Sequence, residues 1–314
     1  NKITMQYLGE LISLGVAVSW TATAIMGEIA TKHLGKIPLN VLRMLLVIIF
    51  SSLLLFITTG SPLPINADLE TWMWLLLSGI VGYVMGDYCL FSSYLIIGSQ
   101  FGQLFMTLAP MMAAIAAWIT LGQQLNLQSI LAMIVTLTGI SISILGRGKS
   151  HTLSLKLPLK GVLFGIGAGL GQGLGLVISK IGLDHYQELN KMLIGTKTEF
   201  ILPFSANLIR CIAGLIGFTS ILYIYKGFGN LKEVIHDRKG MTAALLTTIF
   251  GPFIGVGFSL MAVQYTSAGI ASTLMATTPI LILLPSHYIF HTQITKNAVI
   301  GAIVSVIGVS LFFI

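Results

Sequence analysis

The chain has 314 residues, of which 55% are hydrophobic and only 9% are charged, and its net charge is +7. A soluble domain carries charge on about 25% of its residues, so this composition excludes a water-soluble globular protein and indicates a polytopic membrane protein. The basic excess lies in a few loops without interleaved aromatic residues, which argues against a nucleic-acid surface. The two cysteines, Cys89 and Cys211, lie far apart in apolar segments, so they indicate neither a disulfide framework nor a metal cluster.

Apolar runs between polar, proline and glycine breaks predict an all-α membrane protein of ten transmembrane helices, since one span needs roughly 20 apolar residues. The first five helices are expected near Leu8–Thr31, Leu39–Gly60, Thr71–Ile97, Phe101–Leu121 and Leu127–Leu145. The second five are expected near Lys160–Leu183, Phe200–Lys226, Met241–Tyr265, Ala268–Phe290 and Lys296–Ile314. We therefore predict a first repeat over residues 1–146, a basic linker over 147–159 and a second repeat over 160–314.

The two halves show weak internal similarity. A shift of 169 residues places Gly82 on Gly251, Gly86 on Gly255 and Pro110 on Pro279, and Asn40-Val-Leu-Arg43 matches Asn207-Leu-Ile-Arg210. These matches favour a 5+5 duplication, and because five is odd, the second half must enter the membrane in the opposite sense. Composition bias in apolar helices is the alternative explanation.

The Asn-x-x-Arg near the head of the second span of each half, the proline within the fourth span and the glycine-rich fifth span carry a family resemblance. The chain resembles the EamA-type branch of the drug/metabolite transporter superfamily over nearly its whole length. It departs at Gly122-Gln123 and His291-Thr292, where the family often has Gly-Glu. The resemblance implies a carrier of small metabolites, with a central cavity formed largely by the first, third and fourth spans of each half.

Asp87 lies near the middle of the third span, where an ionised carboxylate is costly unless it is paired or hydrated. It could face a cavity, bind substrate and carry a proton, or it could be permanently paired with an arginine. Arg210 lies deep in the seventh span and could face a substrate carboxylate or Asp87, or form a helix-to-helix ion pair. Arg43, one turn into its span, could extend to the membrane surface.

Other polar and aromatic side chains gather at similar depth, in part at i,i+4 spacing that puts them on one helix face. They could line a common chamber for a small organic molecule, or they could be ordinary packing and interhelical hydrogen-bonding groups. This set of candidate substrate-binding residues is Trp20, Tyr83, Gln103, Thr107, Gln172, Phe253, Thr273 and Thr277.

Three further groups complete the candidates. His287 is a second possible titrating residue or a packing histidine. Pro110 and Pro279 each remove a helical hydrogen bond, so they predict kinks that either serve as hinges or are purely structural. Glu28 and Lys180 align between the repeats and are expected at the membrane interface. The glycines of the sixth span lie on two faces, which predicts tight packing on both flanks or sliding.

Only Asp87 qualifies as a mid-span acid, and no hydrolase, metalloprotease or phosphate-loop motif occurs, so we expect no enzyme, no metal and no cofactor. The leading hypothesis is a secondary active or facilitative carrier for a small polar or amphipathic metabolite, such as an amino acid, working by alternating access, with proton coupling as one option. Its partners would be the substrate and the lipid bilayer. The alternative is a non-transporting membrane protein such as a lipid scramblase or assembly scaffold.

Orientation in the cell membrane is predicted differently by two arguments. With the N-terminus outside, the cytoplasmic loops hold most of the lysines and arginines, as the positive-inside rule requires. These cytoplasmic residues would be Lys32, Lys36, Arg147, Lys149, Lys156, Lys160, Lys226, Lys232, Arg238, Lys239 and Lys296. The family resemblance implies instead that both termini are cytoplasmic.

Overall fold

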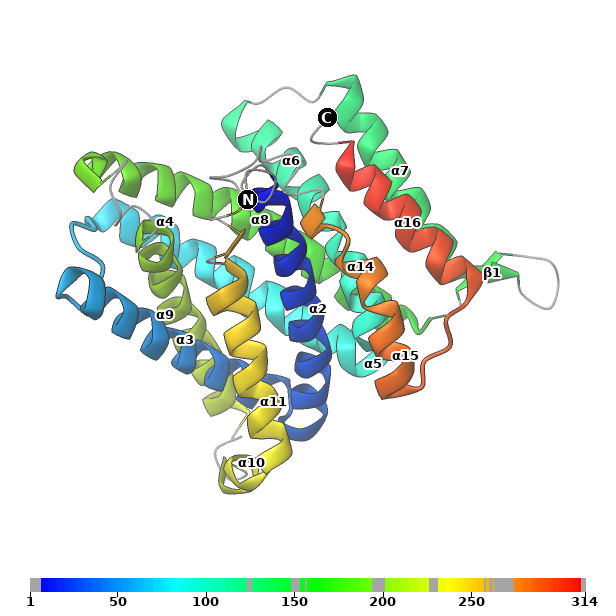
Figure 1. Cartoon of the computed structure of the whole chain (residues 1–314), viewed down its shortest axis with the longest axis horizontal. Helices are drawn as coiled ribbons and strands as arrows, with labels where there is room; N and C mark the ends of the chain where they lie inside the picture. Colours follow the sequence, from blue (N-terminus) through cyan, green and yellow to red (C-terminus); the bar gives the residue numbers. More distant parts are fainter. Residues whose placement is uncertain are drawn as a thin grey trace.

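The chain folds into a helical bundle, shown in Figure 1 as a computed structural model. The structure describes residues 7–122, 126–147, 153–155, 157–193, 201–225, 231–256, 258–259, 262 and 274–311. The elements of the first half are α2 (Leu8–Leu34), α3 (Lys36–Thr59), α4 (Leu69–Gly79), η1 (Ile80–Asp87), α5 (Tyr88–Met106), α6 (Leu108–Leu121) and α7 (Leu127–Ile144). The remaining elements are β1 (Leu145–Arg147), β2 (Leu153–Leu155), α8 (Leu159–Leu189), η2 (Lys191–Leu193), α9 (Ile201–Ile224), α10 (Leu231–His236), α11 (Arg238–Thr248), η4 (Ile249–Gly255), α14 (Thr278–Leu281), α15 (Leu283–Phe290) and α16 (Lys296–Ser310).

Six of the described helical segments are long and apolar enough to cross a membrane. They are Leu8–Leu34, Lys36–Thr59, Leu69–Met106, Leu127–Ile144, Leu159–Leu189 and Ile201–Ile224, and shorter apolar helices cover Leu108–Thr120, Thr278–Phe290 and Lys296–Ser310. The prediction of a multi-pass helical membrane protein is therefore confirmed. The linker between the halves is not wholly irregular, because β1 and β2 pair as an antiparallel hairpin.

Glycines end two helices at the places where the sequence predicts span boundaries. Gly35, with φ 79°, lies between α2 and α3 and lets the chain reverse within one residue. Gly98, with φ 80°, interrupts α5 and separates the third predicted span from the fourth. The long segment 69–106 is therefore two helices that meet at a bend.

Local irregularities recur at the 169-residue spacing. The π-helical segments η1 and η4 begin at Ile80 and Ile249, positions that the shift superposes. Helices also break shortly before the two matched prolines, at Thr107 before Pro110 and at Thr277 before Pro279. The helix breaks thus precede both prolines, and the kinks predicted at the prolines themselves stay a prediction.

Helices α7 and α16 pack side by side (Figure 1) through small residues at equivalent positions. A Cβ atom on Gly139 would lie 2.4 Å from the backbone nitrogen of Ser305, and one on Gly308 would lie 2.4 Å from that of Thr136. Because a shift of 169 carries Thr136 to Ser305 and Gly139 to Gly308, the two contacts are the same contact seen from each helix. Close approach of this kind requires small residues.

The glycine-rich α8 is packed on both flanks. A Cβ atom on Gly171 would lie 2.6 Å from the Cα of Gly86 in η1, and one on Gly165 would lie 2.4 Å from the ring of Phe105 in α5. Both glycine faces of α8 are therefore in contact, which fixes the position of Gln172 against η1.

Candidate functional site

A buried ion pair joins α3 to η1 at the centre of the candidate site. Arg43 donates from Nη1 to Asp87 Oδ2 at 2.9 Å and to Asn40 Oδ1 at 2.7 Å. The side chains of Arg43 and Asp87 are only 6% and 5% exposed. The prediction that Arg43 extends to the surface is wrong, because α3 begins at Lys36 and carries Arg43 deeper than the expected start at Leu39. Arg43, and not Arg210, is the ion-pair partner of Asp87.

Asp87 is also bonded from the opposite side by α8. Gln172 donates from Nε2 to Asp87 Oδ1 at 2.9 Å, with a longer contact of 3.3 Å to the carbonyl of Gly82. Each carboxylate oxygen of Asp87 therefore has its own donor, and the donors come from different helices. Since a buried charge is tolerated only when it is paired and hydrogen-bonded, Arg43, Asp87 and Gln172 form one electrostatic unit.

The second Asn-x-x-Arg lies on α9, which packs against α3 and η1. The hydroxyl of Tyr83 donates to Asn207 Oδ1, and Asn207 donates in turn to the carbonyl of Pro252 in η4 at 3.3 Å. The guanidinium carbon of Arg210 lies 4.9 Å from the centroid of the Tyr83 ring. The hydroxyl of Tyr83 and the carboxylate of Asp87 therefore bond to different helices, although i,i+4 spacing predicts a common face and the Tyr83 ring also packs with residues of α3. The segment is π-helical, with i to i+5 hydrogen bonds, so the α-helical periodicity does not apply.

Arg210 differs from Arg43 in its partners. Among the residues that the structure describes, Arg210 makes no ion pair, and its Nε has no hydrogen-bond partner. Among the described residues, the cluster thus contains the buried guanidinium of Arg43, the partly buried guanidinium of Arg210 and a single carboxylate, that of Asp87. The position that the repeat makes equivalent to Asp87 is Val256, which supplies no acid for Arg210.

The remaining predicted hydrogen-bonding residues are largely engaged within the bundle. Gln103 donates to the hydroxyl of Tyr94 at 2.7 Å. The Thr107 and Thr277 hydroxyls donate to carbonyls three residues earlier in their own helices. Thr273 lies outside the described residues. In the described conformation, these hydroxyls do not join the cluster around Asp87.

Two predicted aromatic residues lie against η4. A Cβ atom on Gly255 would lie 2.7 Å from Trp20 Nε1, so the indole packs directly on the backbone of this segment. Phe253 packs its ring against Phe50 of α3 and Phe204 of α9, with centroid distances of 5.5 and 5.9 Å. Both residues are only partly buried, so they remain available as walls of a binding site.

Two hollows are lined by described residues, and neither lining includes Asp87. An open, mostly apolar groove of about 670 Å³ is lined by residues of α9 between Leu215 and Ile224. A second void, of about 10 Å³, lies among residues that include Gln100, Ser143 and Pro279. It is the size of one water molecule, and the buried amide of Gln100 and the Ser143 hydroxyl have no protein partner. The central cavity that the resemblance implies stays a prediction, because part of its expected lining, such as Thr273, lies outside the described residues.

His287 is not part of the buried cluster. It lies near the end of α15 with its side chain exposed, and its Nδ1 contacts the carbonyl oxygen of Thr292 at 2.7 Å. Pro110 and Pro279 lie in the first turns of α6 and α14, directly after the helix breaks. At these positions a missing backbone N–H costs little.

Glu28 is a buried acid whose environment the sequence did not reveal. It was expected at the interface, but its side chain is 4% exposed. Its Oε2 accepts a hydrogen bond from the backbone nitrogen of Ser99 at 2.6 Å, directly after the Gly98 bend, and its Oε1 pairs with Lys32. Glu28 therefore caps the start of the fourth span from α2. Its repeat equivalent, Lys180, is exposed and pairs with Asp184.

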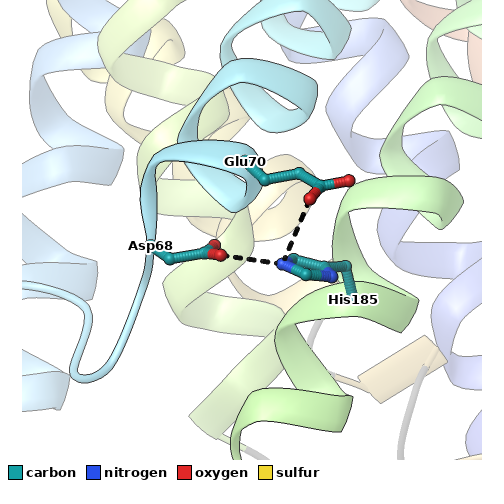
Figure 2. Close-up of side chains that lie close together, drawn as sticks. All are labelled: Asp68, Glu70 and His185. Atoms are coloured by element: carbon teal, nitrogen blue, oxygen red, sulfur yellow. Dashed lines mark hydrogen bonds and ion pairs between the residues drawn. The ribbon is translucent and has the colours of Figure 1, made fainter.

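One group of metal-type ligands occurs among the described residues. Asp68, Glu70 and His185 place one ligand atom each within 4.8 Å of one another, as Figure 2 shows. Asp68 also accepts a hydrogen bond from the backbone of Thr71, and the His185 side chain beside it holds the pKa of the Asp68 carboxyl well below its usual range. These residues satisfy one another as an ion-pair group, and nothing else at this exposed surface points to a metal ion.

Comparison with known proteins assigns the family. The family described as "EamA-like transporter family" matches residues 7–145 and again residues 159–314. The chain belongs to the EamA-like transporter family. Membership makes it a multi-pass membrane protein of the drug/metabolite transporter superfamily.

The fold is shared with solved structures. One, titled "Crystal structure of protein", is 14% identical, with a TM-score of 0.55 over 98% of this chain and 96% of that chain. At this identity the likeness concerns the fold alone. No curated protein matches the sequence.

Proposed function

We propose that the protein is a carrier that moves a small carboxylate-bearing metabolite, such as an amino acid or a related compound, across the cell membrane by alternating access. Ten spans would form a 5+5 inverted repeat around the buried cluster. The repeated family match and the recurrence of η1 as η4 and of the two proline breaks support this arrangement. Inverted repeats allow one set of helices to adopt two mirror-related conformations, which is the usual basis of alternating access.

The observation that carries the proposal is the imbalance of charge in the buried cluster. Asp87 is neutralised by Arg43, whereas Arg210 has an aromatic ring beneath it and no carboxylate partner in the described part of the chain. An unpaired charge at this depth is costly, and intramembrane charges of this kind mark substrate pathways. A substrate carboxylate would supply the missing counter-ion through charge-assisted hydrogen bonds, for which a guanidinium is well shaped. Trp20 and Phe253 would then provide the aromatic walls.

The role of Asp87 decides whether transport is coupled to protons. In the described state its two oxygens are bonded to Arg43 and Gln172, an arrangement that holds α3, η1 and α8 together. Proton coupling requires that this pair opens during the cycle, and facilitated transport does not. An Asp87→Asn protein that still exchanges substrate but no longer accumulates it against a pH gradient would support coupling.

Reconstitution into liposomes tests the proposal. Purified protein should show saturable uptake of at least one member of a labelled mixture of carboxylate metabolites. Uptake should fall with Arg210→Gln, fall less with Arg210→Lys, and stay unchanged with Trp118→Ala, because Trp118 is 52% exposed on the outer surface of α6. Lipid scrambling without saturable flux of any solute would favour the non-transporting alternative over the carrier.

Orientation follows from which end of the bundle carries the basic residues. The contact of His33 with Asp237 brings Lys32, Arg238 and Lys239 to one end, together with Lys36. We propose that this end is cytoplasmic, which places the N-terminus outside, against the expectation from the family resemblance. Labelling of a cysteine introduced in segment 146–159 by an impermeant reagent on intact cells would reverse this assignment.

A further inference from the structure

Two histidine–aspartate bridges occur in the structure, and each joins helices from different halves of the chain. His185 Nε2, near the end of α8, lies 2.9 Å from Asp68 Oδ2, at the start of α4 (Figure 2). His33 Nδ1, near the end of α2, lies 2.8 Å from Asp237 Oδ2, at the start of α11. All four side chains are partly exposed, so the bridges lie at the surface and not in the buried cluster.

The two bridges are repeat equivalents. A shift of 169 carries Asp68 to Asp237, and the shift of 152 that superposes the first helices of the halves carries His33 to His185. In both aspartates, one carboxylate oxygen caps the following helix and the other faces the histidine. Asp68 Oδ1 caps the backbone nitrogen of Thr71 and Asp237 Oδ1 caps that of Gly240, each at 2.9 Å, while Oδ2 faces the histidine.

The pKa values of both aspartates are lowered by their hydrogen-bond donors. The bond to His185 is the main reason why the pKa of Asp68 lies well below its usual range. The backbone N–H of Gly240, followed by His33, lowers the pKa of Asp237. Both carboxylates are therefore ionised at neutral pH, and each can accept a hydrogen bond from its histidine in either charge state of the ring.

The bridges lie at opposite ends of the bundle. The start of α8 lies beside the α2–α3 turn that carries His33, because Lys36 lies over the ring of Phe164 and a Cβ atom on Gly161 would meet Ile97. His185 follows Gly161 by 24 residues in the same helix, which corresponds to about 36 Å of helix length. This length exceeds the roughly 30 Å of a bilayer's hydrocarbon core, so one bridge faces each side of the membrane.

We infer that the two bridges are the latches of an alternating-access cycle, His33–Asp237 closing one membrane face and His185–Asp68 closing the other. This inference rests on the carrier function proposed above. Each bridge ties the first helix of one repeat to the third predicted span of the other, so an opening between the repeats at that face must break it. Both bridges are formed in the structure, which corresponds to an occluded state of this cycle.

The two latches differ in the charges beside them. Glu70 Oε2 lies 3.9 Å from His185 Nε2 and adds a second carboxylate to that bridge. The repeat equivalent of Glu70 is Lys239, a cation beside the other bridge. A protonated His185 is thus held by two acids, whereas His33 has one acid and neighbouring cations. The His185 face is therefore the face that is more tightly closed, and Glu70→Lys should reduce this difference.

Cysteine labelling from each side of the membrane tests the latches without knowledge of the substrate. The reporter is Thr277→Cys in a chain with Cys89→Ala, because Thr277 and Cys89 are partly buried whereas Cys211 has no exposed surface. A charged, impermeant thiol reagent is applied to intact cells and to inside-out vesicles. His185→Asn should raise the labelling rate from the His185 face relative to the opposite face, and His33→Asn should change this ratio in the opposite direction.

The expected change in the ratio is about two- to fivefold, the range that exposed ion pairs support. Asp184→Asn is the matched control, because it breaks the exposed pair with Lys180 one residue before His185 and should leave the ratio unchanged. Asp68→Asn retains an oxygen for the helix cap and should reproduce the effect of His185→Asn. Changes of the same sign in both histidine variants, or none, in folded protein overturn the latch assignment. A reporter with no dependence on the side of reagent addition in any variant refutes alternating access itself.

Discussion

Arg43→Gln and Asp87→Asn each remove one partner of the buried ion pair, and they should not be equivalent. Loss of one partner of a buried pair costs about 3–5 kcal/mol of folding free energy, because it leaves an uncompensated charge. Asp87→Asn leaves Arg43 with the Asn40 carbonyl oxygen and the ring of Phe91, 4.7 Å from the guanidinium carbon. Arg43→Gln leaves Asp87 with the neutral amide of Gln172 as its remaining side-chain hydrogen-bond donor among the described residues. We therefore expect Arg43→Gln near the upper end of this range and Asp87→Asn near the lower end.

The double variant measures the interaction energy between Arg43 and Asp87 apart from the contacts that each makes with other residues. Because Arg43→Gln with Asp87→Asn removes both charges together, its loss should be smaller than the sum of the single losses by at least about 1.5 kcal/mol. The measurement is a denaturant titration of the purified protein in mild detergent, followed by circular dichroism. Additive losses, or a loss below about 0.5 kcal/mol in each single variant, would refute the assignment of a coupled, desolvated pair.

Three further predictions concern substrate and packing. Arg210→Gln should weaken the affinity for a carboxylate substrate by about tenfold, and Arg210→Lys by less, because a charge-assisted hydrogen bond is lost or partly kept; equal affinity of all three proteins, measured by calorimetry, would contradict this role. Gly139→Val should lower the free energy of unfolding by about 1–3 kcal/mol, because the larger side chain overpacks against α16. Gly15→Ala should raise it by up to about 1 kcal/mol, because a Cβ atom there meets nothing within 4 Å. Equal effects of the two variants in a denaturant titration would refute the packing argument. Trp20→Ala should reduce transport in liposomes more than Trp118→Ala, and comparable losses in folded protein would remove Trp20 from the site.

The helical framework could be predicted from the sequence because its causes are local. Long apolar runs must be helical in a bilayer, and Gly35 and Gly98 mark bends because glycine tolerates positive φ. The spacing of 169 residues was also readable; it superposes Gly139 on Gly308, but it did not predict that these glycines lie in the contact between α7 and α16. Whether ten spans form the inverted repeat stays a prediction.

The partners within the candidate site could not be predicted in the same way. Asp87 and Gln172 were singled out by depth, but the choice of Arg43 over Arg210 depends on where α3 begins and how it crosses η1. The π-helical geometry of η1 shifted Tyr83 and Asp87 onto different neighbours, which an α-helical period does not anticipate. The buried position of Glu28 has a similar cause, because it depends on a turn supplied by another span. Such contacts between distant segments leave no periodic signal in one sequence.

The two repeats differ in charge at the candidate site, and the proposed binding of a carboxylate substrate depends on this difference. Arg43 and Arg210 are repeat equivalents, but their acid partners are not: Arg43 pairs with Asp87, whereas the second half has Val256 at the position equivalent to Asp87. A fully symmetric cluster would hold two neutral pairs and no net charge, and so would not attract a carboxylate. Val256→Asp should restore that symmetry by giving Arg210 an acid of its own, because Val256 follows η4 as Asp87 completes η1. We expect this variant to remain folded and to lose affinity for carboxylate substrates by about tenfold or more, while Val256→Asn, which adds polarity without charge, should lose much less. Thermal-shift titration with the substrate measures both variants, and a Val256→Asp protein that binds the carboxylate as tightly as the parent would show that Arg210 is not its counter-ion.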